Sequence, residues 1–477
     1  MLIQKIEKDS KYIDIYEIVV PKAHLLRKIR ENVDFSFANK IMEECYCKNF
    51  GRPAYEPELM LKILFLKLLH DLSDREVMDR CRMDMGFKFF LNLNPEDEVP
   101  DNSLLAKFRT LRVTEEKLQE FLNETVRQAL KKKIIKSNTI IVDSTHSRSK
   151  HNPQTPTQIL REMTKQLRKE IHRTQNEISN VFPEKPASED DVFEEIDYTK
   201  KLITAISNTQ LKSEKARKQL VKVQETLELP NLVELQSNID EDAKIGHKSV
   251  DTNFFGFKNH IAMAEEGIIT GLSVTNGTSS DNKEFENIVN QTIKNGINVK
   301  DVSGDKAYST SDILKFGKEN EINIISKLKS NVGSKEYSSQ YIEFNKDADT
   351  YECKSGFLAK CHKPRSNGSM EYSFSKYDCK NCPFASGCIG NNKYNYKRIW
   401  KNEKSHLFEE QRLFEDTQKF KEKAKTRWKI EQRNAHLKNR YGLDITHGTG
   451  LFSMKAQSFL TAMTANIVKI AKLIPHV

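Results

Sequence analysis

The N-terminal third of the chain carries the apolar pattern of packed helices. Residues 56–72 (EPELMLKILFLKLLHDL) have enough apolar positions for a buried helix. Ser73 and Glu76, directly after it, match a capping box, which predicts the start of a second helix. Residues 114–133 place acids in a first turn and lysines in a last turn, as the helix dipole favours. The pattern predicts an all-helical domain over residues 1–135.

Two arginines stand at the end of another helix of this domain. Residues 99–112 (VPDNSLLAKFRTLR) predict a short capped helix that ends in Arg109 and Arg112. A basic, all-helical domain suits DNA binding, and we expect both arginines to contact DNA. A helical dimerisation domain is equally consistent with the pattern.

Strand patterns replace the helical ones after this domain. Residues 138–145 (NTIIVDST) form a β-branched run that leads into Asp143. Residues 254–264 and 268–275 are two further apolar runs, and the short EEG segment between them predicts a hairpin turn.

Helices and strands alternate beyond the hairpin. The predicted elements are a helix at 282–295, a strand at 298–305, a helix at 310–319 and a strand at 322–328. Asp143 ends the first strand of the region, and Asp305 ends the strand that follows the first helix. The order predicts a mixed α+β or α/β sheet domain with an acid at the ends of two strands.

A helical segment of another kind separates the first strand from the hairpin. Two apolar stripes run through it: Leu160, Met163, Leu167 and Ile171, and then Ile196, Leu202, Ile206, Leu220, Val223 and Leu227. We interpret residues 150–246 as an antiparallel pair of long helices inserted into the sheet domain. A structural or protein-contact arm is the favoured role, and we assign it no chemistry.

The C-terminal region contains a basic helix with one acid among its cations. Arg427, Glu431 and Lys438 are four and seven residues apart, so they share one side of a helix, and Ile430 and Leu437 can face a core. The acid forms either an ordinary exposed ion pair or part of a functional site. Farther on, the apolar stretch 458–474 is too short and too charged to span a bilayer, which predicts a packed C-terminal helix.

Composition points to a polyanionic partner. The chain has 477 residues, a formal charge of +10 and a pI near 8.9, so nucleic acid is favoured over an anionic membrane. The N-terminus MLIQKIEKDSKY lacks the apolar stretch of a secretory signal. The eight cysteines are therefore expected in a reducing cytoplasm, where metal ligation or free thiols are favoured over disulfides.

Acids at the ends of neighbouring strands suit two-metal phosphoryl transfer. That chemistry needs a few carboxylates on rigid elements, which hold two hard cations ~3.5–4 Å apart. Asp143 and Asp305 meet this demand from the sheet, and Glu431 can join them from a helix packed on it. Mg²⁺ suits such a site because it accepts one or two carboxylates together with substrate phosphate. Strand-end aspartates also cap helices and turns, so the pattern by itself is consistent either with a metal site or with ordinary capping.

Five motifs in order resemble bacterial insertion-sequence transposases of the DDE class. IIVDST is similar to the segment of their first aspartate, VSGDKAYST to that of the second, and RWKIEQRNAHLK to their glutamate helix. GRPAYEPELMLKILFLKLLHDLSDREVMDRCRMDMGFKFFLNL, with VPDNSLLAKFR, resembles the helical N-terminal domain of one branch. GFKNHIAMAEEGIITGLSVTNGTSSD is similar to the hairpin segment of the core. The resemblance covers most of residues 50–145 and 240–477.

The resemblance implies an RNase H-like core and a set of site residues. Asp143, Asp305 and Glu431 would be catalytic and would hold two Mg²⁺ or Mn²⁺ ions, while Arg427 and Lys438 would grip phosphates on either side. Many members carry a tyrosine three residues before the arginine, where this chain has Ala424, which puts the role of that tyrosine in doubt. His260 and Asp281 match polar positions of the family core, where they either support the metal site or fill structural roles.

The resemblance also implies the reaction. Such a protein binds the terminal inverted repeats of its own element, cleaves there and joins the freed 3′-hydroxyl to target DNA. The resemblance implies that the partner is double-stranded DNA and that two copies of the chain assemble on it as a homodimer. It also implies a location in the bacterial cytoplasm at the nucleoid, with no membrane partner. An RNase H-like nuclease that cuts without joining is one alternative, and a catalytically inactive, transposase-derived DNA-binding protein is another.

The cysteines form a second candidate site. Cys379 and Cys382 have the spacing of a zinc chelate, with Cys388 just beyond and Cys353 upstream. These four resemble the cysteines of an insertion that this branch carries before the glutamate. A structural Zn²⁺ and a set of reduced thiols are both consistent with the pattern. Cys361 and His362 are rival fourth ligands, whereas Cys45, Cys47 and Cys81 are expected to pack between helices.

The expected domain plan follows from these elements. It comprises a helical DNA-binding domain (1–135), the first parts of an RNase H-like core (136–149 and 247–345), a helical-hairpin insertion (150–246), a cysteine-containing insertion (346–395) and the C-terminal part of the core with the glutamate helix (396–477).

Overall fold

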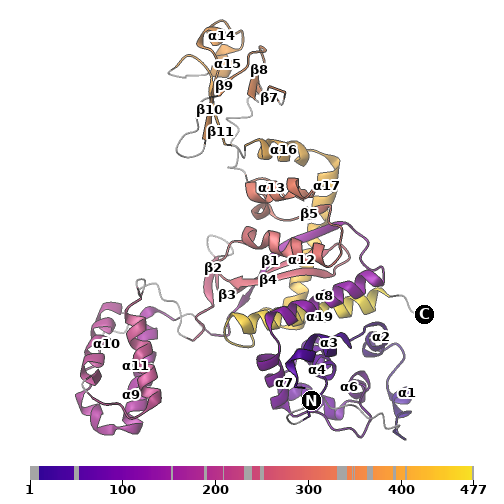
Figure 1. Ribbon diagram of the computed structural model, residues 1–477, viewed down its shortest axis with the longest axis vertical. Helices are drawn as coiled ribbons and strands as arrows, with labels where there is room; N and C mark the ends of the chain where they lie inside the picture. Colours follow the sequence, from indigo (N-terminus) through magenta and orange to yellow (C-terminus); the bar gives the residue numbers. More distant parts are fainter. Residues whose placement is uncertain are drawn as a thin grey trace.

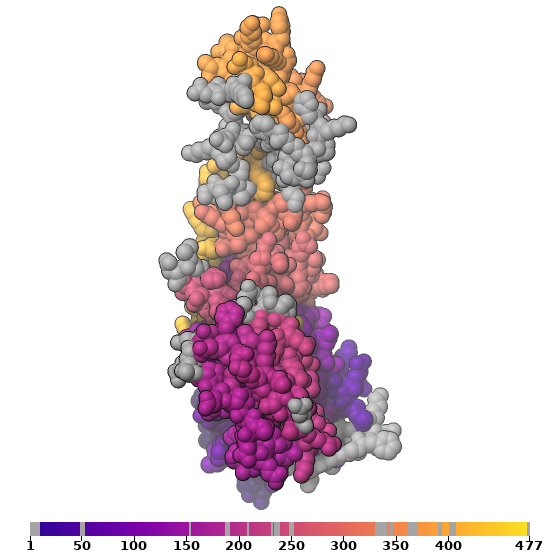
Figure 2. All heavy atoms as spheres, turned by 90° about the vertical axis from the view of Figure 1, so that its left-hand side faces the viewer, coloured from indigo at the N-terminus to yellow at the C-terminus, as the bar shows by residue number. Residues whose placement is uncertain are grey.

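The computed structural model describes residues 10–47, 53–151, 154–186, 191–207, 209–229, 232, 239–247, 252–329, 341–345, 347–348, 350–361, 369–389, 394–402 and 405–474. Figure 1 shows four parts: an N-terminal group of helices, a sheet with its own helices, an arm of helices and a small strand-and-helix module. The arm and the module lie at separate ends of an elongated molecule, which Figure 2 shows from the side of the arm.

The N-terminal part is helical, as the apolar pattern predicts. Its helices are α1 (Ile15–Val19), α2 (Leu25–Asn32), α3 (Phe37–Met42), α4 (Pro57–Leu69), α5 (Asp74–Met83), α6 (Met85–Phe90), α7 (Asn102–Lys107) and α8 (Glu115–Lys131). Helix α4 is buried on most of its surface, which explains its nearly continuous apolar sequence. The predicted capping box is present, because Ser73 accepts from the Glu76 backbone and Glu76 accepts from the Ser73 backbone.

The central sheet mixes parallel and antiparallel strands. Its strands are β1 (Thr139–Arg148), β2 (Lys244–His247), β3 (Asn253–Ala264), β4 (Ile269–Asn276), β5 (Asp301–Ser303) and β6 (Asn323–Ile325). The order is β2-β3-β1-β5-β6, and β4 also pairs with β3. The β3–β4 hairpin is confirmed, and β5 and β6 run parallel to β1.

A glycine permits the close approach of β5 to β1. The parallel register ends with Ile141 opposite Ser303. Just beyond it, Val142 packs against Gly304, and the charge of Asp305 acts on Asp143. A Cβ at residue 304 would lie 3.0 Å from Val142 Cγ2 and 2.8 Å from Tyr308 Cδ2. Only glycine leaves space for both side chains, and this packing fixes the end of β5 next to β1.

The remaining helices cover the sheet and join it to the N-terminal domain. They are α12 (Phe285–Lys294), α13 (Ser311–Glu319), α16 (Ser405–Glu415), α17 (Gln418–Ala424), α18 (Trp428–Tyr441) and α19 (Leu451–Leu473). Helix α19 is buried along most of its length beside α8, as expected of a packed C-terminal helix (Figure 1). No helix in the described ranges is long and apolar enough to cross a membrane.

A single asparagine ties three elements together inside this interface. The Asn466 side chain on α19 accepts from the Ile269 backbone N–H and donates to the Ile269 carbonyl oxygen, both at 2.8 Å. It also donates to Thr125 Oγ1 on α8 at 3.1 Å. Asn466 is fully buried, so these hydrogen bonds satisfy an edge of the sheet that water does not reach.

The described residues of the arm form three α-helices, so the prediction of a two-helix hairpin is wrong. Helix α9 (Pro156–Thr174) is followed by α10 (Val192–Ser207) and α11 (Glu214–Leu227). The second apolar stripe was taken as one helix, but it breaks before Ser213, whose side chain caps α11. The three helices share a core of their own, which includes Met163, Leu167, Ile171, Tyr198, Leu202, Ile206 and Val223.

The cysteine-containing module is built mainly from short strands. A hairpin of β7 (Ile342–Asn345) and β8 (Thr350–Cys353) accompanies a sheet of β9 (Lys360–Cys361), β10 (Ser369–Ser373) and β11 (Arg398–Asn402). Two single-turn helices, α14 (Lys376–Lys380) and α15 (Ala385–Ile389), carry Cys379 and Cys388, and Cys382 lies between them. The described core is small: Ile342, Tyr351, Ala359, Phe374 and Ile399.

Replacing Asn466 by Ala should destabilise the protein through its buried hydrogen bonds. The change leaves the Ile269 N–H and C=O unpaired in a dry interface, which costs about 2 kcal/mol or more. Thermal melting should show a clear fall in Tm. The control Asn439→Ala, at an exposed position of α18, should melt close to wild type. Equal melting temperatures for the two variants would contradict the role given to Asn466.

Candidate active site

Asp143 is a half-buried carboxyl group in the middle of the sheet. Strand β1 lies between β3 and β5, and Asp143 is paired with Ile261 of β3. Burial raises the pKa of Asp143 from 3.8 to about 7, and the charges of Asp305 and Asp281 act in the same direction. A backbone hydrogen bond at Ser144 and the charge of Arg427 act in the opposite direction. The site therefore concentrates negative charge where solvent is scarce.

Asp305 follows β5 and starts a short turn. Its side chain accepts from the Ala307 backbone N–H at 2.9 Å, which fixes the carboxylate beside the end of the strand. Tyr308, one turn later, is buried, and its hydroxyl has no hydrogen-bond partner among the described residues. Burial raises the Tyr308 pKa well above its ordinary value, and Asp281, Asp143 and Asp305 add to the rise. The negative charges of the three aspartates thus favour the neutral form of the Tyr308 phenol.

Helix α18 lays one face against β1. Asn434 Nδ2 donates to Asp143 Oδ2 at 2.9 Å, while Asn434 Oδ1 is buried without a partner in the described chain. One turn farther on, Lys438 Nζ lies 3.2 Å from His146 Nε2 on the same strand and 3.8 Å from an Asp444 oxygen. The helix is therefore docked on the strand that carries Asp143.

Glu431 belongs to this helix but turns toward solvent. Its carboxylate pairs with Arg427 at 2.7 Å, and the two side chains are 52% and 39% exposed. Among the residues that the structure describes, no three His, Cys, Asp or Glu side chains come close enough to hold a metal ion. The structure thus brings Asp143 and Asp305 together, while the part of Glu431 in metal binding stays a prediction.

His260 and Asp281 lie beside the aspartates, and both predicted roles fit their surroundings. His260 is buried on β3, with Nε2 2.9 Å from Thr275 Oγ1 and Nδ1 4.0 Å from Asp281 Oδ1. Lys258 holds the same Asp281 oxygen at 3.1 Å. Burial lowers the His260 pKa, so the ring is neutral at pH 7. Lys258 therefore fixes the Asp281 side chain, which does not point freely toward Asp143 and Asp305.

A wide groove of about 1010 Å³ leads to Asp305. Its wall contains Arg427 and the lysines at 306, 327, 421 and 425, together with the acids at 415 and 416. Ala424 also lines it, so the position where related chains carry a tyrosine faces the groove. A groove with this excess of cations suits a polyanion whose phosphate approaches the aspartate.

The two arginines of the N-terminal domain are engaged inside the chain. Arg109 forms a two-pronged contact with Asp74, at 3.1 and 2.9 Å. Arg112 donates to the Cys45 carbonyl oxygen at 2.7 Å and lies over the Tyr46 ring. Their contact with DNA stays a prediction, because intramolecular partners already explain both side chains.

Four cysteines of the small module line one cavity. Cys353, Cys379, Cys382 and Cys388 surround a space of about 30 Å³. Burial raises the pKa of Cys388, and the other three thiols add to the rise, so all four are neighbours. His362, a rival ligand, lies outside the described residues, as does the side chain of Cys361.

Sequence reasoning missed Asn434, although its position carried a signal. It lies three residues after Glu431, which places it one turn farther along the same side of the helix. A polar residue there, between the apolar Ile430 and Leu437, marks a contact with something other than the core. Arg427 was predicted as a phosphate contact, whereas the groove lysines were missed because they come from three separate segments of the chain.

Comparisons with known proteins agree with this geometry. A family model described as a transposase DDE domain matches residues 134–467, and one described as a transposase domain (DUF772) matches residues 14–111. An uncharacterized protein, ORF8 in the nfe locus of Rhizobium meliloti, is 37% identical over 87 residues, which are 17% of this chain and 39% of that protein. No solved structure matches the chain.

Replacing Asp143 by Asn should stabilise the metal-free protein at high pH. The folded state keeps the Asp143 proton up to about pH 7, whereas an unfolded carboxyl loses it near its ordinary pKa of 3.8. Wild-type stability therefore falls as the pH rises between these values, and the variant lacks this fall. In thermal melts with EDTA, the variant should exceed wild type by a few degrees at about pH 8 and match it at about pH 4.

Glu422→Gln is the control, because Glu422 is exposed on α17. Its melting temperature should follow wild type at both pH values. An Asp143→Asn protein that behaves in the same way would show that Asp143 carries no unfavourable charge.

Proposed function

The chain belongs to the transposase DDE domain family, and we propose that it binds the terminal inverted repeats of its own insertion sequence, cleaves the DNA there and joins the freed 3′-hydroxyl to target DNA. The family implies an RNase H-like fold, with which the mixed sheet agrees. The observation that carries the proposal is the juxtaposition of Asp143, in the middle of β1, and Asp305, just after β5, beneath a helix rich in cations.

Divalent cations such as Mg²⁺ are general in this family. Asp143 and Asp305 fit such a cation, because two neighbouring carboxylates repel each other until a positive charge lies between them. The unpartnered Asn434 Oδ1 is a further oxygen beside Asp143. We propose that these two aspartates and Glu431 hold two Mg²⁺ ions, which when bound activate the attacking oxygen and stabilise the leaving one.

The protein's own groups have separate tasks in this proposal. Asn434 orients the Asp143 carboxylate through its hydrogen bond. Arg427, which directly precedes α18 and lines the groove, binds the phosphate backbone near the cleaved bond, and Lys438 does so on the other side. The groove lysines hold the rest of the strand by charge, which makes affinity depend on salt.

The wider assembly follows from the reaction. The N-terminal domain contributes to DNA affinity, and two copies of the chain handle two element ends as a homodimer on double-stranded DNA. The reaction takes place on DNA in the bacterial cytoplasm.

Removing any one of the three acids should abolish magnesium-dependent nicking. Asp143→Asn, Asp305→Asn and Glu431→Gln preserve side-chain shape and remove the charge that a cation needs, so the rate should fall roughly a thousandfold or more. Nicking is measured on duplex DNA that carries the ends of the element, and gel-shift assays should show unchanged or slightly tighter DNA binding.

Two controls make this test specific. Glu422→Gln should nick at the wild-type rate, because the exposed Glu422 side chain accepts from Gln418 and is not among the residues that line the groove. A Glu431→Gln protein with wild-type activity would leave Glu431 as an exposed ion-pair partner. Strand transfer from a pre-cleaved 3′-hydroxyl end distinguishes a transposase from a nuclease that only cuts.

We also propose that the cysteine-containing module holds one structural Zn²⁺. Four thiols around one small cavity are a donor set that zinc prefers. The described core of the module has five buried apolar side chains, and a core of this size needs added stabilisation such as a bound metal. The described atoms do not show the thiols at metal-binding separations, so the support is the donor set and its shared cavity.

Metal analysis of the purified full chain tests the zinc proposal. Wild type should contain about one zinc per chain, and the Cys379→Ser, Cys382→Ser double variant should contain none. Cys81→Ser is the matched control, because Cys81 is buried in the helical domain and should not affect zinc. Equal zinc in all three proteins would assign the four cysteines as reduced thiols.

A further inference from the structure

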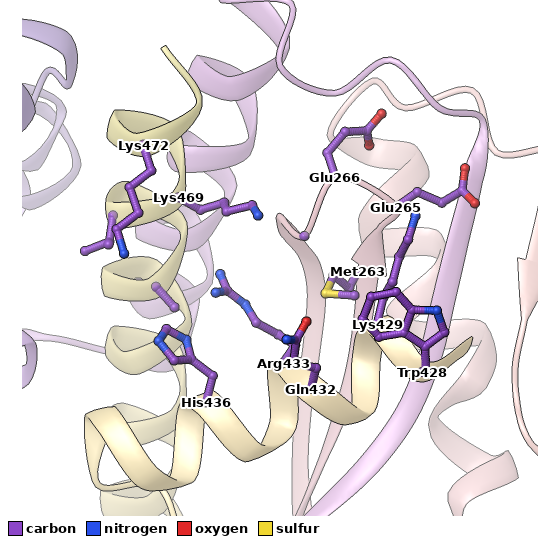
Figure 3. Close-up of a pocket in the computed structure, with 13 residues that line it drawn as sticks. Met263, Glu265, Glu266, Trp428, Lys429, Gln432, Arg433, His436, Lys469 and Lys472 are labelled. Carbon is purple, nitrogen blue, oxygen red and sulfur yellow. The ribbon is translucent and has the colours of Figure 1, made fainter. Parts of the chain in front are cut away.

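A second basic cavity lies on the other side of α18 from the aspartates. It has a volume of about 390 Å³, is open to solvent and is lined by α18, α19 and the β3–β4 turn. Its cations are Lys429, Arg433, Lys469 and Lys472, with His436 beside them. Figure 3 shows Arg433 from α18 and Lys469 from α19 extending toward the same space.

The acids at the rim of this cavity face other partners. Glu265 accepts from Ser137 Oγ and lies 3.5 Å from Lys423 Nζ. Glu266 accepts from the backbone N–H groups of Lys136 and Ser137, and Figure 3 shows its carboxylate turned away from Arg433. Among the described residues, no carboxylate forms an ion pair with any of the four cations. The interior of the cavity is therefore positive.

Arg433 is the unsatisfied group at its centre. Its Nε and Nη2 atoms are buried and have no hydrogen-bond partner in the described part of the chain. These two atoms form one edge of the guanidinium, the edge that binds two oxygens of a phosphate side by side. An arginine held in this state is stabilised by an anion.

The turn between β3 and β4 positions Lys469 at the cavity. Gly267 has a φ of +88°, and a Cβ there would lie 3.2 Å from Lys469 Cε and 3.5 Å from Lys469 Nζ. Lys469 is thus held over the turn and close to Arg433, whose charge together with burial lowers its pKa. Two converging cations are brought together despite their mutual repulsion.

We propose that this cavity, centred on Arg433 and Lys469, binds a phosphate group of the DNA backbone. The inference rests on the proposed function only for the source of the phosphate. Helix α18 then contacts DNA from two sides: Arg427 and Lys438 near the aspartates, and Arg433 in the cavity. A DNA strand bound in the cavity is thereby positioned by the same helix that touches Asp143.

Inorganic phosphate is the first probe, used with the full-length protein. Wild-type Tm should rise with phosphate beyond the effect of chloride at equal ionic strength, since a ligand stabilises the folded state that binds it. Arg433→Gln should lower phosphate affinity about tenfold, as expected when a charge-assisted bidentate contact is lost. Without phosphate, its Tm should equal or exceed that of wild type, because a buried unpaired charge is removed.

Further variants keep the test decisive. Lys469→Gln, at a partly exposed position, should also weaken the phosphate effect, and Arg217→Gln, exposed on the arm, should leave it unchanged. An Arg433→Gln protein that loses stability and keeps the full phosphate effect would overturn the proposal and leave Arg433 a structural residue.

Duplex DNA then distinguishes the source of the phosphate. The slope of log affinity against log salt should be smaller by about one for Arg433→Gln than for wild type. A lost phosphate effect with an unchanged slope would overturn the DNA assignment in favour of a free phosphate compound. Failure of the catalytic proposal is separate, because it is read from nicking by the Asp143 and Asp305 variants.

Discussion

The parallel pairing of β1 with β5 places two carboxylates side by side, and the rest of the site depends on this. Asp143 and Asp305 lie 162 positions apart in the sequence and meet only because the register brings the end of β5 next to the middle of β1. Gly304 makes the approach sterically possible, and burial makes it electrostatically unfavourable. Positive charge would relieve the repulsion between the two carboxylates, so a sheet that retains such a pair is expected to bind a cation there.

Helix α18 is the element that turns this pair into a site. Ile430 and Leu437 bury one side of the helix in the core, which fixes its position. Asn434 then reaches Asp143, Arg427 reaches the groove, and Arg433 reaches the cavity beneath α19. Because these side chains belong to one rigid rod, a DNA strand that contacts the outer ones is aligned with the aspartates.

The sequence predicted much of this arrangement and missed the rest for physical reasons. The strands that carry or precede Asp143 and Asp305 followed from apolar and β-branched runs, but Asp143 was expected to end its strand and instead lies in the middle of β1 (Thr139–Arg148). The exposed pairing of Glu431 with Arg427 followed from their spacing. The break between α10 and α11 was missed because two amphipathic helices in one core share an apolar stripe. The cavity around Arg433 joins the β3–β4 turn, α18 and α19, so no local pattern predicts it.

The central claim is that Asp143, Asp305 and Glu431 hold divalent cations at one place. The most direct measurement is anomalous diffraction from crystals of the protein with Mn²⁺ and DNA of the element's ends, because Mn²⁺ scatters anomalously and accepts the same oxygen ligands as Mg²⁺. The account predicts Mn²⁺ peaks between Asp143 and Asp305, with the Glu431 carboxylate turned from Arg427 to join them. Mn²⁺ bound elsewhere, with Glu431 still paired to Arg427, would contradict it.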